Sequence, residues 1–206
     1  METMSFTDFV LERSVVYRLW QAPFAHQKFA PIIAHNDLSR VRHVLDVGCG
    51  PGTNSLYFSH TRYLGIDINE GYIDTARRRF GLDFEAIDAR AYQAHPQDRF
   101  DFILVNSFLH HLCTEDVKCL FKHLATLLTE DGCVHILEPE LPLAGSIAYL
   151  LARADRGKFI RPIDDWDSIF SSTFRKILFE PYPLKAGGVT LWKMLYFKGA
   201  SRVGSE

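Results

Sequence analysis

The amino-acid sequence predicts an α/β fold in which helices cover both faces of a doubly wound, mostly parallel sheet. Short apolar runs alternate with helical patterns from residue 43 to residue 137, an order typical of such sheets. The apolar runs are nearly continuous, as expected of strands that are covered on both faces. A glycine-rich stretch, 48–52, follows the first run, where a strand would turn tightly into a helix.

The individual elements follow from local patterns of apolar residues. The clearest helix is 115–128, because its apolar residues recur at the three- and four-residue spacing of one buried stripe. Two further helices are expected in this region, at 53–59 and 70–80. Strands are expected at 43–47, 63–66, 84–87, 100–105 and 133–137.

The two ends of the chain depart from this alternation. Two helices rich in aromatic residues are expected first, at 6–20 and 24–34, and they either pack on the sheet or form a lid over a pocket. Residues 142–172 read as a helical insertion, and 174–179 with 189–197 as a strand pair that forms a hairpin at the sheet edge. We therefore expect one domain, 1–206, with an N-terminal helical lid over 1–36 and a small helical cap over 142–172.

The composition excludes several classes of protein. Apolar residues make up 47% of the 206 residues and charged residues 23%, which argues against a disordered chain. The 23 basic and 25 acidic side chains give a net charge of -2, which does not favour nucleic-acid binding. The four cysteines form no CxxC pair, which predicts reduced thiols and no metal site. Reduced thiols are typical of the cytoplasm, so a cytoplasmic protein is predicted. No apolar run reaches the roughly 18 to 20 residues of a membrane span.

An acidic residue marks the glycine-rich turn. Asp46 lies two residues before Gly48, at the end of the first predicted strand. A pyrophosphate placed there would meet like charge in a partly desolvated site, so a cationic ligand group is favoured. The third glycine of the dinucleotide fingerprint would fall at Thr53, whereas Gly52 comes one place early. Both observations disfavour a nicotinamide oxidoreductase.

Two further acids follow the next two predicted strands. Asp67 lies 19 residues after Gly48, where a carboxylate can accept hydrogen bonds from both hydroxyls of a ribose. Asp88 closes the third strand, within reach of a purine amine on the same wall of the crevice. Either acid alone is an ordinary strand end or helix cap, but three acids on consecutive strands indicate a nucleoside site.

With these motifs, 43–139 resembles the class I S-adenosylmethionine-dependent methyltransferases. Within that class, 106–112 resembles the type 11 small-molecule group, which includes quinone-biosynthesis enzymes. The resemblance implies a seven-stranded, Rossmann-like sheet with an antiparallel last strand. It also implies S-adenosylmethionine as cofactor and a small, partly apolar molecule as methyl acceptor. The near-neutral charge, and not the resemblance, predicts that no nucleic acid is a partner.

The resemblance assigns a set of residues to the cofactor. Asp46 would lie near the ammonium or organise that end of the site, and Asp67 would bind the ribose. Asp88 would hold the adenine edge, while Asn106 and Ser107 would present backbone groups beside the sulfonium. The remaining residues of the set are Gly48, Cys49, Gly50 and Gly52 with Asn54 around the methionine moiety, and Ile68 and Ala89 around the adenine.

Methyl transfer from a sulfonium needs no acid catalyst, because the leaving group is good and alignment in a dry pocket supplies much of the acceleration. A base matters only for a hydroxyl or an acidic carbon. His110 and His111 are the candidates, and at most one of them should face the pocket. Their alternative roles are to cap the next helix and to pack beneath the lid. A protein that binds the cofactor without transferring methyl and a nucleic-acid methyltransferase remain open.

Overall fold

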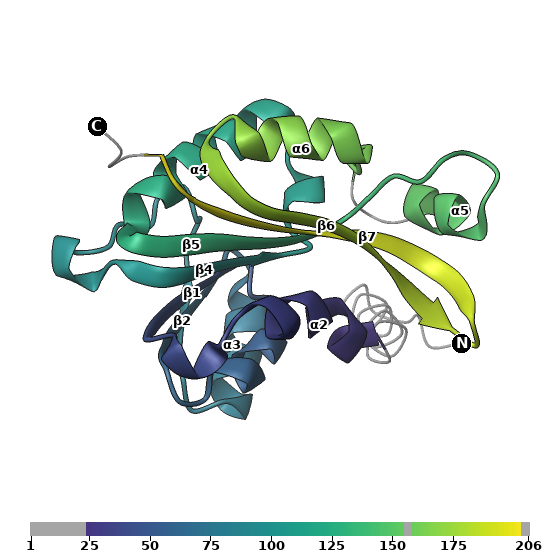
Figure 1. Ribbon diagram of the computed structural model, residues 1–206. Coiled ribbons are helices and arrows are strands. Elements are labelled where there is room, and N and C mark those ends of the chain that lie inside the picture. Colours follow the sequence, from purple (N-terminus) through teal and green to yellow (C-terminus); the bar gives the residue numbers. More distant parts are fainter. Residues whose placement is uncertain (1–23, 155–157, 203–206) are drawn as a thin grey trace, which may run out of the picture.

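The computed structural model describes residues 24–154 and 158–202, which form a seven-stranded sheet with the strand order β3-β2-β1-β4-β5-β7-β6 (Figure 1). Strands β1 to β5 are parallel, and β7 runs antiparallel to both β5 and β6. The predicted doubly wound sheet with an antiparallel last strand is confirmed. The strands are β1 (His43–Val47), β2 (Arg62–Asp67), β3 (Asp83–Ala86), β4 (Phe100–Asn106), β5 (Leu128–Pro139), β6 (Phe174–Ala186) and β7 (Val189–Ser201).

Helices cover both faces of this sheet (Figure 1). Helices α4 and α6 lie on one face, α2 and α3 lie on the other, and α5 packs against β7. No helix of the described chain combines the length and the apolar character that crossing a membrane requires. The α-helices are α2 (Ala25–His35), α3 (Glu70–Arg79), α4 (Thr114–Leu127), α5 (Ile147–Ala154) and α6 (Ile163–Ser171).

The predicted apolar stripe of α4 is buried. Leu120, Phe121 and Leu124 have no exposed surface and belong to the larger of the core clusters, together with side chains of β1, β4 and β5. Each such side chain contributes about 1.5–3 kcal/mol by leaving water. Burial of this stripe packs α4 against the face of the sheet.

Several elements differ from the predictions in length or type. The segment after the glycine-rich turn forms a 3-10 helix, Thr53–Phe58, and β5 begins at Leu128 with irregular pairing to β4. Both hairpin strands are longer than predicted, and Pro181 and Pro183, expected in the connection, lie inside β6. An edge strand tolerates proline because its outer side needs no backbone N–H donor.

The second aromatic helix packs on the sheet. Phe29 and Ile32 of α2 are buried, and the Tyr182 hydroxyl of β6 donates a hydrogen bond to the Lys28 carbonyl at 2.8 Å. The Asn36 amide, just after α2, donates to the Tyr196 hydroxyl of β7 at 2.9 Å. Of the two roles considered for 24–34, sheet packing is therefore the one observed. The helix predicted at 6–20 lies outside the described residues.

The segment predicted as a helical insertion contains α5 and α6. Trp166 of α6 is completely buried and donates from Nε1 to the Pro139 carbonyl at 3.1 Å. Its indole is also covered by the Arg161 guanidinium, at 4.6 Å from the ring centre. These contacts fix α6 to the carboxyl end of β5.

Candidate nucleoside site at the carboxyl rim of the sheet

A pocket of about 110 Å³ opens at the carboxyl ends of the first three strands. Two of the predicted acids, Asp67 and Asp88, lie in its wall, and the strand register places Asp46 on the same rim. The remaining wall is mainly apolar, as expected of a site that binds a flat ring. The pocket is lined by Gly48, Ile66, Asp67, Ile68, Ile87, Asp88, Ala89, Arg90, Phe108, Leu112 and Leu120.

The glycine loop closes one side of this pocket. The amides of Gly48 and Cys49 donate to the Ile66 carbonyl at 2.8 and 3.0 Å, which ties the loop to the end of β2. Gly48 has a φ of 68°, and a Cβ atom there would lie 2.7 Å from the Phe108 ring. Only glycine permits both the backbone conformation and this close contact. The predicted need for a residue without a side chain is thus explained at Gly48 by a specific neighbour.

Asp46 is fully buried and organises the loop from within. Its carboxylate accepts hydrogen bonds from the Tyr63 hydroxyl at 2.7 Å and from the Asn54 amide at 3.1 Å. The Asn54 carbonyl in turn accepts from the Asn106 amide at 3.0 Å. Burial raises the pKa of Asp46 to about 6. Of the two roles expected for Asp46, the contacts correspond to organising that end of the site.

An acceptor atom at the end of β4 has no partner within the described parts of the chain. Asn106 Oδ1 is buried there without a hydrogen bond, and burial of such an atom costs roughly 1–3 kcal/mol. The next residue, Ser107, has a φ of 54°, which is uncommon for a residue other than glycine. An unsatisfied carbonyl oxygen at this rim fits a cationic or amine donor, as the ammonium of S-adenosylmethionine would supply.

Asp67 is oriented by two backbone amides. Its Oδ2 accepts from Gly50 N at 2.9 Å, and its Oδ1 accepts from Asn69 N at 2.8 Å. Each carboxylate oxygen can accept more than one hydrogen bond, so the group remains able to accept from ligand hydroxyls. Ile68 is 73% exposed beside it and presents an apolar side chain to the pocket.

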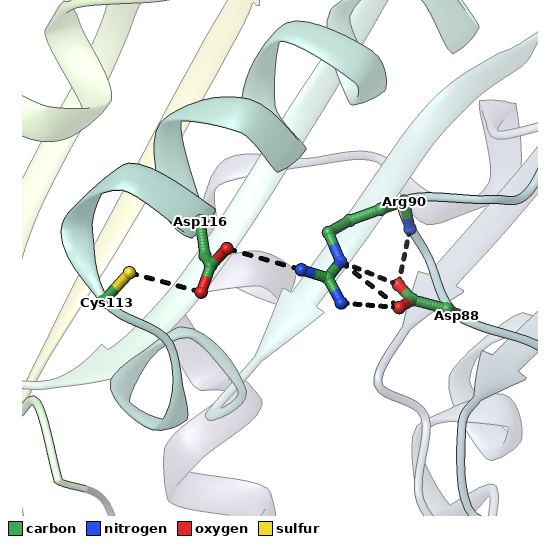
Figure 2. Close-up of polar contacts among 4 residues, drawn as sticks. All are labelled: Asp88, Arg90, Cys113 and Asp116. Atoms are coloured by element: carbon green, nitrogen blue, oxygen red, sulfur yellow. Dashed lines mark hydrogen bonds and ion pairs between the residues drawn. The ribbon is translucent and has the colours of Figure 1, made fainter.

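Asp88 forms a bridge that the sequence analysis did not anticipate (Figure 2). The Arg90 guanidinium donates to Asp88 Oδ1 from Nε at 3.1 Å and to Asp88 Oδ2 from Nη2 at 2.7 Å, and its Nη1 donates to Asp116 at the start of α4 at 3.3 Å. These hydrogen bonds hold the pKa of Asp88 below its usual value. The Cys113 thiol donates to the far side of Asp116 at 3.2 Å. Arg90 therefore links the two walls of the pocket, beside the position predicted for an adenine.

Cys49 and Ala89 complete the predicted set with small side chains. Both are buried, and burial raises the pKa of the Cys49 thiol, which stays protonated. This agrees with a loop residue that takes no covalent part. Ala89 lines the pocket next to Asp88.

The two adjacent histidines lie in different environments. His110 is 3% exposed, and its Nδ1 lies 2.7 Å from Glu138 Oε2, whereas His111 is exposed. Their ring centres are 4.2 Å apart. Neither histidine is among the residues that line the rim pocket, and the expectation that at most one of them faces it stays a prediction. The N-cap of α4 is Cys113, so neither histidine occupies the capping position considered for one of them.

The sequence analysis missed several residues of the site. Phe108 packs against Gly48, Arg90 bridges two acids, and Glu138 binds the turn that carries His110. Arg90 could have been found from the sequence, because it lies two residues after Asp88, a predicted acid of the site. Glu138 lies at the carboxyl edge of a predicted strand, which could have drawn attention to it, but its contact with the turn depends on distant segments, as does the contact of Phe108.

Comparison with known proteins agrees with this geometry. Residues 44–132 match the family described as "Methyltransferase domain". Trans-aconitate 2-methyltransferase from Escherichia fergusonii is 31% identical over 149 residues, which are 66% of this chain and 58% of that protein. The protein of the same name from Shigella dysenteriae is 33% identical over 150 residues, with the same two shares. The chain thus spans little more than half the length of these curated relatives.

Solved structures show the same fold. The PH0226 protein from Pyrococcus horikoshii has a TM-score of 0.68 at 18% identity, and the match covers 88% of this chain and 92% of that one. The N-methyltransferase NodS from Bradyrhizobium japonicum, in complex with S-adenosyl-L-homocysteine, has a TM-score of 0.66 at 15% identity, covering 87% and 88%. Residues 44–132 thus match a methyltransferase domain, and the fold is the seven-stranded sheet that the resemblance to the class I S-adenosylmethionine-dependent methyltransferases implies.

Proposed function

We propose that this protein transfers a methyl group from S-adenosylmethionine to a small, partly apolar molecule. The observation that carries the proposal is the rim pocket, whose apolar walls hold two acids, Asp67 and Asp88, beside the glycine loop. An apolar slot with carboxylates at its edge suits a nucleoside, because the base packs on the walls and its hydroxyl and amine donors reach the acids.

Each residue of the predicted set has a role in this proposal. Asp67 accepts the ribose hydroxyls, and Ile68 packs against the adenine. Asp88, held by Arg90, faces the adenine edge. The Asp46 and Asn54 pair holds the amide of Asn106, so that Asn106 Oδ1 points to the place of the ammonium. Gly48, Cys49, Gly50, Gly52, Ala89 and Ser107 complete the binding surface.

The cofactor supplies a methyl carbon bound to a positively charged sulfur, which accepts an electron pair readily. The protein's task is therefore to orient the acceptor and to keep water out. We propose that the chain forms one domain, 1–206, in which the cap over 142–172 has this task; of the lid predicted over 1–36, helix α2 packs on the sheet instead. We propose His110 or His111 as the group that takes up a proton when the acceptor has one to lose, although neither is among the residues that line the rim pocket.

The acceptor class rests on the relatives and on the charge of the chain. The curated relatives are named trans-aconitate 2-methyltransferases, and a small acid of that kind is one acceptor to test. A net charge of -2 gives little support for binding a nucleic acid. A small quinol or phenol is the other class, as the resemblance of 106–112 to the type 11 group suggests. We also propose a cytoplasmic location, from the reduced cysteines.

The test combines binding and turnover. Calorimetry with S-adenosylmethionine and with NAD should give a measurable Kd for the first ligand only. The protein is then incubated with S-adenosylmethionine and either trans-aconitate or a panel of phenols and quinols, and release of S-adenosylhomocysteine is followed. Binding without release for any acceptor would favour a protein that only binds the cofactor. Absence of binding would overturn the proposal.

A further inference from the structure

Arg90 lies in the wall of the rim pocket, in the segment that follows β3. Among the described residues that line this pocket it is the only basic one, and it stands with the acids Asp67 and Asp88. Three of its donors meet Asp88. The Arg90 amide donates to Oδ1 at 2.9 Å, Nε donates to Oδ1 at 3.1 Å, and Nη2 donates to Oδ2 at 2.7 Å (Figure 2). The guanidinium and the carboxylate thus form a two-pronged contact rather than a single ion pair.

These contacts nearly fill the acceptor capacity of Asp88. An ionised carboxylate has about four lone-pair sites, two on each oxygen. Oδ1 accepts from the Arg90 amide and from Nε, whereas Oδ2 accepts one short bond from Nη2 and a longer approach of Nε, at 3.2 Å. One strong acceptor position therefore remains, and it belongs to Oδ2. Because Asp88 lines the pocket, this position suits a hydrogen-bond donor of a bound ligand.

The far side of the guanidinium is held by α4, which also contributes Leu120 to the pocket. Nη1 of Arg90 donates to Asp116 Oδ1 at 3.3 Å, and Asp116 Oδ2 accepts from the Cys113 thiol at 3.2 Å (Figure 2). Ion pairs between half-exposed side chains add little to stability. The arrangement is therefore better explained by the group that it orients than by the free energy that it adds to the fold.

The group that Arg90 orients is the Asp88 carboxylate. An aspartate side chain turns about two bonds, and hydration does not select one of its orientations. The backbone amide of Arg90 fixes only Oδ1. The planar guanidinium contacts both oxygens at once, so it also fixes the plane of the carboxylate and the direction of the remaining acceptor position. A lysine at the same place would supply charge without this fork.

We infer that Arg90 is a positioning residue that sets the base selectivity of the rim pocket, by fixing Asp88 so that it accepts from the 6-amino group of adenine. The inference rests on the proposed function. An amino group at that place donates to Oδ2 of Asp88. The carbonyl oxygen of hypoxanthine would instead bring a second acceptor against the carboxylate, with no hydrogen between them. Without Arg90 the carboxylate turns toward water, and this difference between the two bases is lost.

The test compares two ligands that differ at one position of the base. S-Adenosyl-L-homocysteine carries the 6-amino group, and its deaminated form, S-inosyl-L-homocysteine, carries a carbonyl there. Neither ligand has a methyl group to transfer, so the experiment requires no acceptor. Calorimetry on the full chain gives a Kd for each ligand, and the ratio of the two Kd values measures the selectivity.

The wild type should bind S-adenosyl-L-homocysteine about 10- to 100-fold more tightly than the deaminated ligand, as expected for one hydrogen bond to a charged group. In Arg90→Gln this preference should fall to about threefold or less, mainly through weaker binding of the adenine ligand. The matched control is Arg62→Gln. Arg62 also forms a short ion pair, with Asp98 at 2.7 Å, but it begins β2 at the end opposite the rim. Its preference should stay within about twofold of the wild-type value.

Two further variants separate positioning from charge and from direct contact with the base. Arg90→Lys keeps the charge and loses the fork, so it should lose the preference as Arg90→Gln does, and it carries the test if Arg90→Gln does not fold. In an Asp88→Ala protein, adding Arg90→Gln should change the preference by less than about twofold, because the effect passes through Asp88. A wild-type preference in Arg90→Lys, or a further loss when Arg90 is changed in the absence of Asp88, would overturn the inference.

The outcomes also distinguish this inference from the proposed function. A preference that Arg90→Gln leaves unchanged, or a wild type that binds both ligands equally, would overturn the inference while the proposed function stands. A wild type that binds neither ligand would refute the proposed function, and the inference with it. Urea unfolding of each variant establishes that a lost preference belongs to a folded protein.

Discussion

The Tyr63 hydroxyl donates to Asp46 Oδ2 at 2.7 Å, inside a part of the core where Asp46 has no exposed surface. Burial raises the pKa of this carboxyl to about 6, from 3.8 for the free group. The folded protein therefore binds the proton more tightly than the unfolded chain does. The free energy of unfolding should fall as pH rises from 3.8 to about 6, by roughly 3 kcal/mol from this group.

Asp46→Asn should remove that part of the pH dependence. Urea unfolding at several pH values between 4 and 7 measures this effect. The slope of the free energy of unfolding against pH should differ between wild type and variant. Asp83→Asn is the control, because Asp83 is exposed at the opposite end of the sheet. If the free energy of unfolding depended on pH in the same way in wild type and in Asp46→Asn, the raised pKa would be contradicted.

Asp67→Ala should weaken binding of S-adenosylmethionine by about 1–3 kcal/mol, or about 5- to 150-fold, because the charge-assisted bonds to the ribose are lost. Calorimetry on the folded variant measures this directly. Asp83→Ala removes an equivalent charge away from the rim and should leave the affinity within about twofold. An Asp67→Ala protein with wild-type affinity would show that Asp67 lies outside the cofactor site.

Gly48→Ala should be destabilising, because the new Cβ atom would lie 2.7 Å from the Phe108 ring and the φ of 68° disfavours a side chain. We expect a loss of about 1–3 kcal/mol in the free energy of unfolding, with weaker cofactor binding. In Gly81→Ala the added methyl has no neighbour within 4 Å, so this variant is the matched control. A stable Gly48→Ala protein that binds normally would rule out a close-packed loop.

Arg90→Gln breaks the bridge between Asp88 and Asp116, yet it should change stability by less than about 1 kcal/mol. The three side chains are 34% to 48% exposed, and ion pairs in that setting are screened by water and salt. Urea unfolding at low and at high salt measures the effect, which should shrink at high salt. A loss of more than about 2 kcal/mol in the free energy of unfolding, unchanged by salt, would show instead that the bridge contributes strongly to stability.

The succession of parallel strands and helices along the chain could be predicted because local patterns carry that information. The stripe of α4, with Leu120 and Leu124, and the turn at Gly48 each depend on neighbours in sequence. Asp67 and Asp88 could be assigned to one rim because parallel strands end at the same edge.

The parts that could not be predicted depend on long-range contacts. Glu138 reads as an ordinary strand end until the chain brings it to His110, 28 residues earlier. Arg90 meets Asp116 because the fold brings the start of α4 beside the segment that follows β3. The first helix of the proposed lid, at 6–20, stays a prediction.

Pro181 and Pro183 lie two positions apart in β6, the last strand of the sheet. Backbone N–H groups two positions apart face the same side of a strand, so the outer border of β6 lacks two successive donors. The carbonyl groups of another strand that paired with this border would have no N–H donor at Pro181 or at Pro183. The outer border of the hairpin is therefore a poorer template for pairing with another chain at the positions of these two prolines.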